Sequence, residues 1–163
     1  MVVGQFSLDV DVLVIGGGPA GYTAAFTAAA LGKTVAIVDP EETLGGDCLH
    51  KACIPSKSAL HDVDGAKTIA ILGKGLEQRC SVLDIERLHG FAHFENAKTV
   101  QITGEVVSVV KFKRAIIASG SSPRTDSAFN QPHVCQVEEV YGDFPSSNNV
   151  LVVGSTPSAI EAA

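Results

Sequence analysis

Basic residues are scarce in this chain of 163 residues: 12 lysines and arginines stand against 18 aspartates and glutamates, a formal net charge of −6 at pH 7. No basic stripe exists that could neutralise phosphates, so we expect no nucleic-acid partner. The first residues also lack the basic segment and apolar segment that are typical of a secretory signal. We therefore expect a soluble, cytoplasmic protein, and 45% hydrophobic residues are enough for one domain to bury a sizeable core.

Charged side chains are absent from residues 12–32, a run long enough to cross a bilayer. However, glycines and Pro19 cluster near its start, and its aliphatic β-branched residues occur only near one end. Asp11 and Lys33 flank it closely. These features argue against a membrane span, and we expect no association with a membrane.

The order of segments in the first 39 residues is typical of a nucleotide-binding unit. An apolar, β-branched run at residues 10–15 enters a glycine-rich turn at residues 16–21. An alanine-rich helical stretch follows at residues 22–31, and a second β-branched run at residues 34–38 ends at Asp39. Together these segments form the complete dinucleotide-binding pattern of strand, turn, helix, strand and acid. We therefore predict that an adenine dinucleotide binds here.

Each glycine of the G-x-G-x-x-G pattern has its own mechanical role. Gly16 permits the tight turn, Gly18 lets the backbone approach a pyrophosphate, and Gly21 lets the helix lie close to the strand. The helix N-terminus offers unpaired N–H groups and a positive dipole end. Asp39 can accept both hydrogen bonds of a ribose diol.

Cys48 and Cys53 form a close pair among the four cysteines. In a reducing compartment such a pair is more often catalytic, redox-sensing or metal-binding than structural. Zinc is disfavoured because Cys80 and Cys135 are isolated and supply no second ligand pair. On a regular helix, residues five apart have Cα atoms about 8 to 9 Å apart, too far for a disulfide. We therefore expect a distorted segment, with Pro55 as a plausible cause.

Two lysines could tune these thiols. Lys51 lies between the cysteines and Lys57 lies one turn beyond Cys53, and either cation would favour a thiolate. For Lys51, a solvent-exposed loop lysine without a functional role is the more frequent case. We expect Cys80 and Cys135 to be inert buried thiols, and we expect the aromatic side chains Phe26, Phe91 and Phe94 to lie in the core.

Further motifs extend the pattern over most of the chain. Residues 44–48 read Leu-Gly-Gly-Asp-Cys, residues 53–57 read Cys-Ile-Pro-Ser-Lys, and residues 90–94 and 116–123 are consistent with a strand and a turn. Together with the glycine turn, these motifs resemble the flavin domain of the pyridine nucleotide-disulfide oxidoreductases, most closely the dihydrolipoamide dehydrogenase branch. Ser119 stands where the family usually has threonine.

The resemblance implies an α/β fold: a Rossmann-like FAD-binding domain with a parallel sheet and a three-stranded antiparallel meander. It also implies tight, non-covalent FAD, whose adenine would meet the backbone of Ala92, and NAD only in a full-length form. The residues that the resemblance assigns to FAD are Gly16, Gly18, Pro19, Ala20, Gly21, Asp39, Pro40, Gly45, Gly46, Asp47, Cys48, Lys57, Ala92, Ala118, Ser119 and Gly120.

The same resemblance gives the catalytic residues distinct roles. Cys53 would be the charge-transfer thiol, and Cys48 the interchange thiol that reacts with a small dithiol or disulfide, or with a lipoyl domain. Lys57 and Glu161 match a lysine and an acid that form an ion pair near the flavin in the family. Electrons would pass from dihydrolipoamide to FAD, and then to NAD in the full-length form. Residues 46–52 differ from the common sequence of the family's motif, so glutathione-reductase-like and mercuric-reductase-like substrates remain as alternatives.

The end of the chain resembles the beginning of a second nucleotide-binding unit. We expect residues 1–148 to be the FAD-binding domain with its redox disulfide, and residues 149–163 to begin a truncated NAD-binding Rossmann unit. Thr156 replaces the second glycine of that unit. Full-length relatives are homodimers, and their dimerisation domain is not expected here. The alternative hypothesis is therefore a stand-alone FAD-binding module without turnover.

The middle and the end of the chain predict the remaining elements. Residues 62–86 favour a helix with a break at residues 73–75, and the span before Gly90 is short for the family's two long helices. The other predicted elements are a meander over residues 88–94, 99–103 and 105–110, a buried parallel strand at 115–118, a polar loop at 121–131, a helical turn at 137–141 and a buried strand at 150–153.

Overall fold

The computed structural model describes residues 6–104, 107–122, 127–129, 131–141 and 149–163. The chain divides into two compact units. The sheet unit contains residues 1–46 and 72–120, and the thiol unit contains residues 47–71 and 121–163. Within the described residues, no helix is long and apolar enough to cross a membrane.

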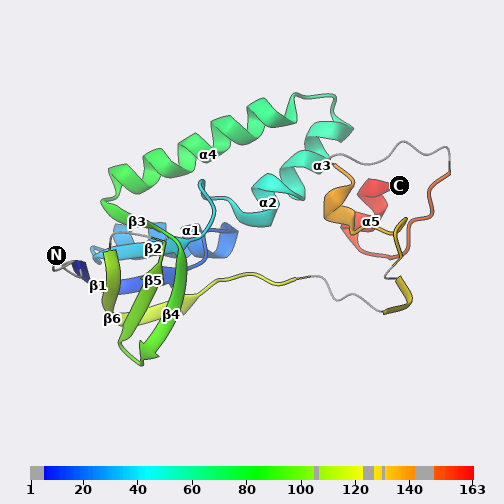
Figure 1. The fold of residues 1–163 in the computed structure, drawn as a ribbon. Coiled ribbons are helices and arrows are strands. Elements are labelled where there is room, and N and C mark those ends of the chain that lie inside the picture. The colour runs from blue at the N-terminus through cyan, green and yellow to red at the C-terminus, as the bar shows by residue number, and fades with distance from the viewer. Residues whose placement is uncertain (1–5, 105–106, 123–126, 130, 142–148) are drawn as a thin grey trace. The chain divides into compact units, whose positions relative to one another are not determined.

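One six-stranded sheet forms the centre of the sheet unit (Figure 1). Its strands lie in the order β3-β2-β1-β6-β5-β4: the first four pair in parallel, and β6–β5 and β5–β4 pair antiparallel. The strands are β1 (Phe6–Ile15), β2 (Val35–Asp39), β3 (Ile85–His89), β4 (Phe91–Asn96), β5 (Thr99–Thr103) and β6 (Val107–Ile117). This arrangement confirms the predicted α/β class, and β6 belongs both to the parallel sheet and to the three-stranded meander.

Two hydrophobic clusters hold this unit together. One joins the sheet to the helices α1 (Pro19–Ala30) and α4 (Gly65–Val82), with Ala25 of α1 and Cys80 of α4 among its buried side chains. The other joins the parallel strands to the meander and includes Leu13, Val100 and Phe112. Helix α1 ends at Ala30, just before Gly32, where its end was predicted. Gly32 has a positive φ of 73°. The β1-turn-α1-β2 order therefore follows the local sequence pattern closely.

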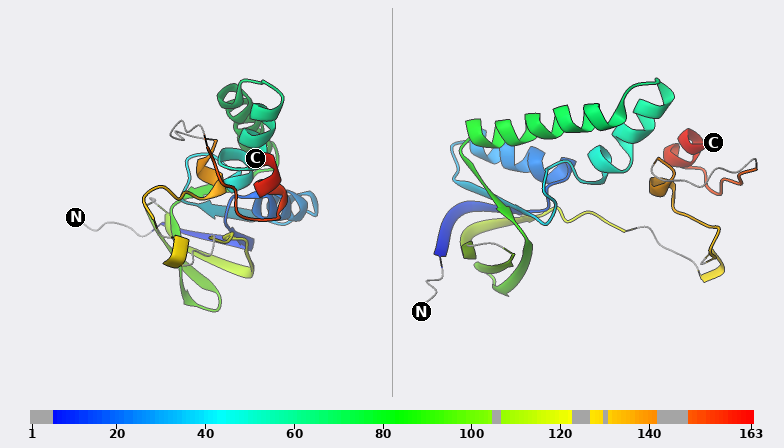
Figure 2. Two further views of the ribbon diagram at one scale, coloured as in Figure 1. Left: turned by 90° about the vertical axis from the view of Figure 1, so that its right-hand side faces the viewer. Right: turned by 45° about the horizontal axis from the view of Figure 1, so that its top comes forward.

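Short helices make up the thiol unit (Figure 2). They are α2 (Gly46–His50, whose first residue belongs to the sheet unit), α3 (Cys53–Leu60), the 3-10 helices η1 (Ser127–Phe129) and η2 (Val137–Glu139), and α5 (Pro157–Ala162). Helix α5 contacts both α3 and η2. The predicted helical turn at residues 137–141 is thus present as η2, and the loop prediction for residues 121–131 falls partly outside the described residues.

The predicted helix break at residues 73–75 is wrong, because α4 continues through it. A glycine inside a helix costs about 1 kcal/mol relative to alanine, a penalty that tertiary packing can offset. Gly73 is buried, which indicates that its missing side chain permits close packing there. The predicted helix also extends too far, since β3 already begins at Ile85. Two helices, α3 from Cys53 and α4, precede Gly90, and α3, with 8 residues, is the short one.

Several predictions of burial are also wrong. Residues 115–117 do run parallel to β1, but Ile117 is 67% exposed. Residues 150–153 form no strand, and Leu151 is 87% exposed, because none of the described strands pairs with this segment. Phe91 is 62% exposed. Phe94 and Cys135 are exposed as well, whereas Cys80 is buried as expected. An apolar run predicts a strand or helix, but it does not reveal which face another segment covers.

Candidate functional site

The glycine turn between β1 and α1 has no room for side chains. Gly16 has a φ of +108°, and a Cβ atom there would lie 2.1 Å from the carbonyl oxygen of Ala118. A Cβ atom on Gly21 would lie 1.8 Å from the carbonyl oxygen of Gly16. Gly21 therefore lets α1 lie close to the end of β1, as its place in the motif predicts.

A second pair of glycines meets this turn. Gly45 donates its N–H to the carbonyl oxygen of Gly17 at 2.9 Å, and a Cβ atom on Gly46 would lie 2.7 Å from Cα of Gly18. Gly18 is also the N-cap of α1, so unpaired helix N–H groups begin at this point. We call residues 16–18 together with Gly21, Gly45 and Gly46 the glycine cradle. Its bare backbone and helix N-terminus are suited to a pyrophosphate.

Asp39 braces the cradle. Its buried carboxylate accepts hydrogen bonds from the N–H groups of Gly17 and, at 2.9 Å, of Glu41. A carboxylate offers about four acceptor positions, so capacity remains for the predicted ribose contact. That contact stays a prediction, and the bracing role is one that the sequence did not reveal.

The other predicted FAD residues of this unit lie on or next to β2, β4 and β6 and at the start of α1. Gly90 separates β3 from β4 with a φ of +151°, and a Cβ atom there would lie 2.2 Å from the carbonyl oxygen of Thr103. Ala92 is half-buried against the core, and Ala118, whose N–H donates to Ile15, lies beside Gly16. The structure thus brings Ala118 to the cradle, whereas the adenine contact of Ala92 is untested. Five further predicted residues are exposed: Pro19, Ala20, Pro40, Ser119 and Gly120.

In the thiol unit, a break between two helices separates Cys48 on α2 from Cys53 on α3. The N–H groups of Lys51 and Ala52 both donate to the carbonyl oxygen of Asp47, at 2.9 and 2.7 Å. The predicted distortion is therefore confirmed. Pro55 contributes to it because, in a continuous helix, its ring would clash with the carbonyl group four residues earlier.

Both cysteines are thiols here, and their side chains share a hydrogen bond. Burial, and after it the Cys53 thiol, raises the pKa of Cys48 to about 11, while Lys57 opposes this rise only in part. Lys57 therefore favours the Cys48 thiolate, as predicted, but burial and the Cys53 thiol outweigh its effect. Lys51 instead forms an exposed ion pair with Asp47 at 3.1 Å.

The predicted ion pair between Lys57 on α3 and Glu161 on α5 is present, with 2.5 Å between Nζ and Oε1. Ser56 donates its hydroxyl to the other oxygen of Glu161, a contact that the sequence did not reveal. The hydrogen bond to Glu161 raises the pKa of Lys57, and hydrogen bonds from Lys57 and Ser56 lower the pKa of Glu161. Thr156 caps α5 by accepting from the N–H of Ala159 at 3.4 Å.

A cavity of about 160 Å³ adjoins these groups within the thiol unit. Cys53, Lys57 and Glu161 line it, together with Tyr141. The Tyr141 hydroxyl is buried and has no hydrogen-bond partner among the described residues. A thiol, an ion pair and a phenol thus converge on one small space, and only the tyrosine gave no signal in the sequence.

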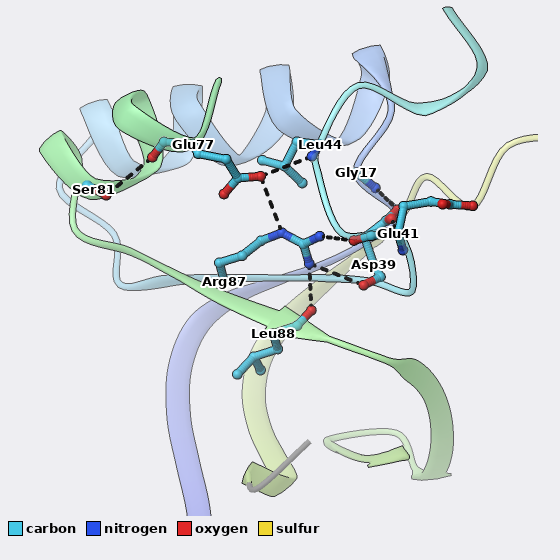
Figure 3. Close-up of polar contacts among 8 residues, drawn as sticks. All are labelled: Gly17, Asp39, Glu41, Leu44, Glu77, Ser81, Arg87 and Leu88. Atoms are coloured by element: carbon cyan, nitrogen blue, oxygen red, sulfur yellow. Dashed lines mark hydrogen bonds and ion pairs between the residues drawn. The ribbon is translucent and has the colours of Figure 1, made fainter. Parts of the chain in front are cut away.

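The sequence also gave no functional role to Arg87 and Glu77, which contact the loop before the cradle (Figure 3). Arg87 is a cation inside a strand that otherwise buries Ile85 and Leu88. A buried cation among apolar residues is costly without partners, and this is the one signal that could have drawn attention to it.

Comparisons with known proteins agree with this geometry. The family model described as pyridine nucleotide-disulphide oxidoreductase matches residues 10–163. A dihydrolipoyl dehydrogenase of Geobacillus stearothermophilus is 38% identical over 152 residues, which cover 76% of this chain and 32% of the relative. Dihydrolipoyl dehydrogenase 3 of Haloarcula marismortui is 36% identical over 154 residues, with the same coverage.

Among solved structures, the HOCl-induced flavoprotein disulfide reductase RclA from Escherichia coli is similar in fold, with a TM-score of 0.65 and 24% identity. The match covers 72% of this chain and 29% of that one. The chain spans about a third of the length of the curated relatives that it matches. The chain belongs to the pyridine nucleotide-disulphide oxidoreductase family.

Proposed function

We propose that this chain is the FAD-binding and dithiol-bearing part of a flavin disulfide oxidoreductase of the dihydrolipoyl dehydrogenase type. The neighbouring thiols of Cys48 and Cys53 carry this proposal, since Cys53 lines a cavity that the Lys57–Glu161 ion pair also lines. Family membership and the relatives' names support it.

The glycine cradle fits FAD because any side chain at Gly16 or Gly46 would fill the space where backbone must approach backbone or ligand. Gly18 and Gly46 would hold the pyrophosphate, Asp39 the ribose and Ala92 the adenine. When bound, FAD supplies the acceptor for the two electrons that leave a dithiol.

The chain's own residues would handle sulfur and protons. Cys48 would exchange with the dithiol or disulfide substrate, and Cys53 would be the thiol that serves the flavin. Forming the Cys48–Cys53 disulfide releases two electrons and two protons. Only a thiolate attacks sulfur, so the raised pKa of Cys48 must fall when the site works. Lys57 already acts in that direction.

Dihydrolipoamide, free or on a lipoyl domain, is the first substrate that we propose, with glutathione-type and mercuric substrates as alternatives. NAD would serve as acceptor in a longer form, for which residues 149–163 begin the second nucleotide-binding unit. Such a form would be a homodimer, as the resemblance implies.

Absorbance spectroscopy tests the proposal. The purified chain mixed with FAD and gel-filtered should be yellow, and dithiothreitol should produce a long-wavelength charge-transfer band. Cys48→Ser should keep both FAD and a lone Cys53 thiolate, whereas Cys53→Ser should keep FAD and lose the band. A colourless protein that takes up no FAD would refute the proposal.

A second candidate is FAD binding without turnover. Thr156 favours it, because the threonine stands where the second glycine of an NAD-binding turn belongs and uses its side chain to cap α5. Lipoamide-dependent oxidation of NADH by the chain separates the two candidates. We expect no such activity from this chain, and measurable turnover would exclude the module hypothesis.

A further inference from the structure

Arg87 holds the loop that follows β2 by its backbone (Figure 3). Its Nη1 donates to the carbonyl oxygens of Leu88 at 2.7 Å and Asp39 at 3.2 Å, and its Nη2 donates to that of Glu41 at 2.5 Å. The side chain is only 16% exposed. One guanidinium thus spans three carbonyl groups, a geometry that its planar fork permits and a lysine ammonium does not.

Glu77 on α4 holds the same loop three residues later. Its Oε1 accepts the N–H of Leu44 at 3.0 Å and lies 3.9 Å from Nε of Arg87. That Nε is buried without a hydrogen bond, so the nearby carboxylate supplies its charge partner. Leu44, which belongs to the loop, is fully buried. Arg87 and Glu77 therefore hold the loop at both Glu41 and Leu44.

This loop controls both halves of the glycine cradle. At its start, the Asp39 carboxylate accepts the N–H of Gly17. At its end, Gly45 donates to Gly17, and Gly46 packs against Gly18. A shift of the loop would therefore move both glycine segments together. Since a pyrophosphate is bound by backbone N–H groups in fixed positions, such a shift would weaken binding.

We propose that Arg87 and Glu77 are positioning residues for the dinucleotide: without touching it, they hold residues 39–46 in the conformation that binds FAD. The inference rests on the proposed function and goes beyond it by naming the residues that prepare the cradle. Burying a cation in β3 is costly, and an apolar residue would serve the core alone at lower cost. The loop contacts account for the arginine at this place.

FAD titration of the 163-residue chain, followed by flavin fluorescence, tests the proposal. Arg87→Met should weaken FAD binding at least tenfold, because it keeps the apolar stem and removes all three carbonyl contacts. Arg87→Lys should restore little. Glu77→Gln keeps an acceptor for Leu44 but loses the charge, and should weaken binding about threefold. Arg114→Met is the matched control: this arginine is exposed, donates to the neighbouring Lys113 carbonyl, and its loss should leave FAD binding as in the wild type.

Each titration is done at a temperature at which circular dichroism shows the FAD-free variant to be fully folded. A merely structural role would lower the melting temperature and leave the affinity unchanged, which would overturn the proposal. If Arg87→Met does not fold, Glu77→Gln decides, and wild-type affinity in that variant would overturn the proposal as well. Failure of the wild-type chain to bind FAD would instead refute the proposed function.

Discussion

The sheet unit and the thiol unit hold their functional groups by different physical means. The glycine cradle is made of backbone, and its close contacts exist because side chains are missing at Gly16, Gly21 and Gly46. The thiol unit presents side chains from short helices, joined by an ion pair whose lysine and glutamate are 51% and 26% exposed. The first site should therefore respond to sterics, and the second to pH and to neighbouring charges.

The largest effect should come from adding one methyl group to the cradle. Gly21→Ala places a Cβ atom against the Gly16 carbonyl, so we expect FAD binding to be lost and stability to fall by about 3 kcal/mol. Gly75→Ala, in α4 where a Cβ atom meets nothing within 4 Å, is the matched control. That control should gain about 0.5 to 1 kcal/mol. Urea unfolding and FAD titration measure both, and equal behaviour of the two variants would contradict the steric account.

The next largest effect should come from removing the Cys53 thiol beside Cys48. Cys53→Ala removes the hydrogen bond and charge that help to raise the pKa of Cys48, while burial continues to raise it. The alkylation rate of Cys48 at pH 7 should then rise several-fold, below the limit of about 100-fold that a fall from 11 to 9 would allow. Iodoacetamide labelling with mass spectrometry of the peptides measures this rate.

Cys80 serves as the internal control for that labelling. Burial alone is the main cause of its pKa of about 11, so the Cys53 variant should leave its rate unchanged. An unchanged rate at Cys48 would show that burial accounts for the whole of its raised pKa.

Loss of the Lys57–Glu161 ion pair should weaken the attachment of α5 to α3. The pKa of Glu161 lies below its ordinary value of 4.5, so its contribution to stability is present above pH 4.5 and is lost as pH falls below that. The pKa of Lys57 lies above 10.5, so its contribution is lost as pH rises past that value. Glu161→Gln should therefore lower the protection of residues 157–162 against hydrogen exchange at pH 7, relative to the unfolded rate at the same pH, and abolish the further loss of protection in acid.

Glu86→Gln, an exposed carboxylate on β3, is the control for charge alone and should leave exchange in α5 unchanged. Equal protection of α5 in the Glu161 variant and the wild type would show that helix packing, rather than the ion pair, holds α5.

The smallest effect should be a gain in stability. The buried Tyr141 hydroxyl has no partner among the described residues, and an unsatisfied buried polar group is destabilising. Tyr141→Phe should therefore stabilise the chain by up to about 1 kcal/mol. Thermal unfolding measures the difference, and a loss of stability would reveal a partner for the hydroxyl.

Local patterns predicted the local structure well. The β1-turn-α1-β2 order and the roles of Gly16 and Gly21 follow from apolar periodicity and glycine spacing within a short stretch of chain. The helix break at the cysteines followed from the reach of a regular helix. The Lys57–Glu161 pair, by contrast, joins residues 104 positions apart, and only the family resemblance suggested it.

Predictions failed where packing outweighs local preference. Gly73 is buried inside a continuous helix although glycine disfavours helices, and Phe91 is exposed although it is aromatic. Periodicity describes what a segment tends to form, but it does not say which neighbour will cover it. For the same reason, the raised pKa of Cys48 could not be read from the lysines beside it.

The sequence by itself determined the β1-turn-α1-β2 unit and the family, and it singled out the two thiols that we propose as the redox pair, because these depend on residue types at short spacing. Only the tertiary structure decided that Gly46 packs on Gly18 and that Asp39 braces Gly17. It also decided that Arg87 and Glu77 hold the loop between them. These contacts join segments far apart in the chain, and the folding of the whole sheet unit, rather than any local preference, brings them within reach.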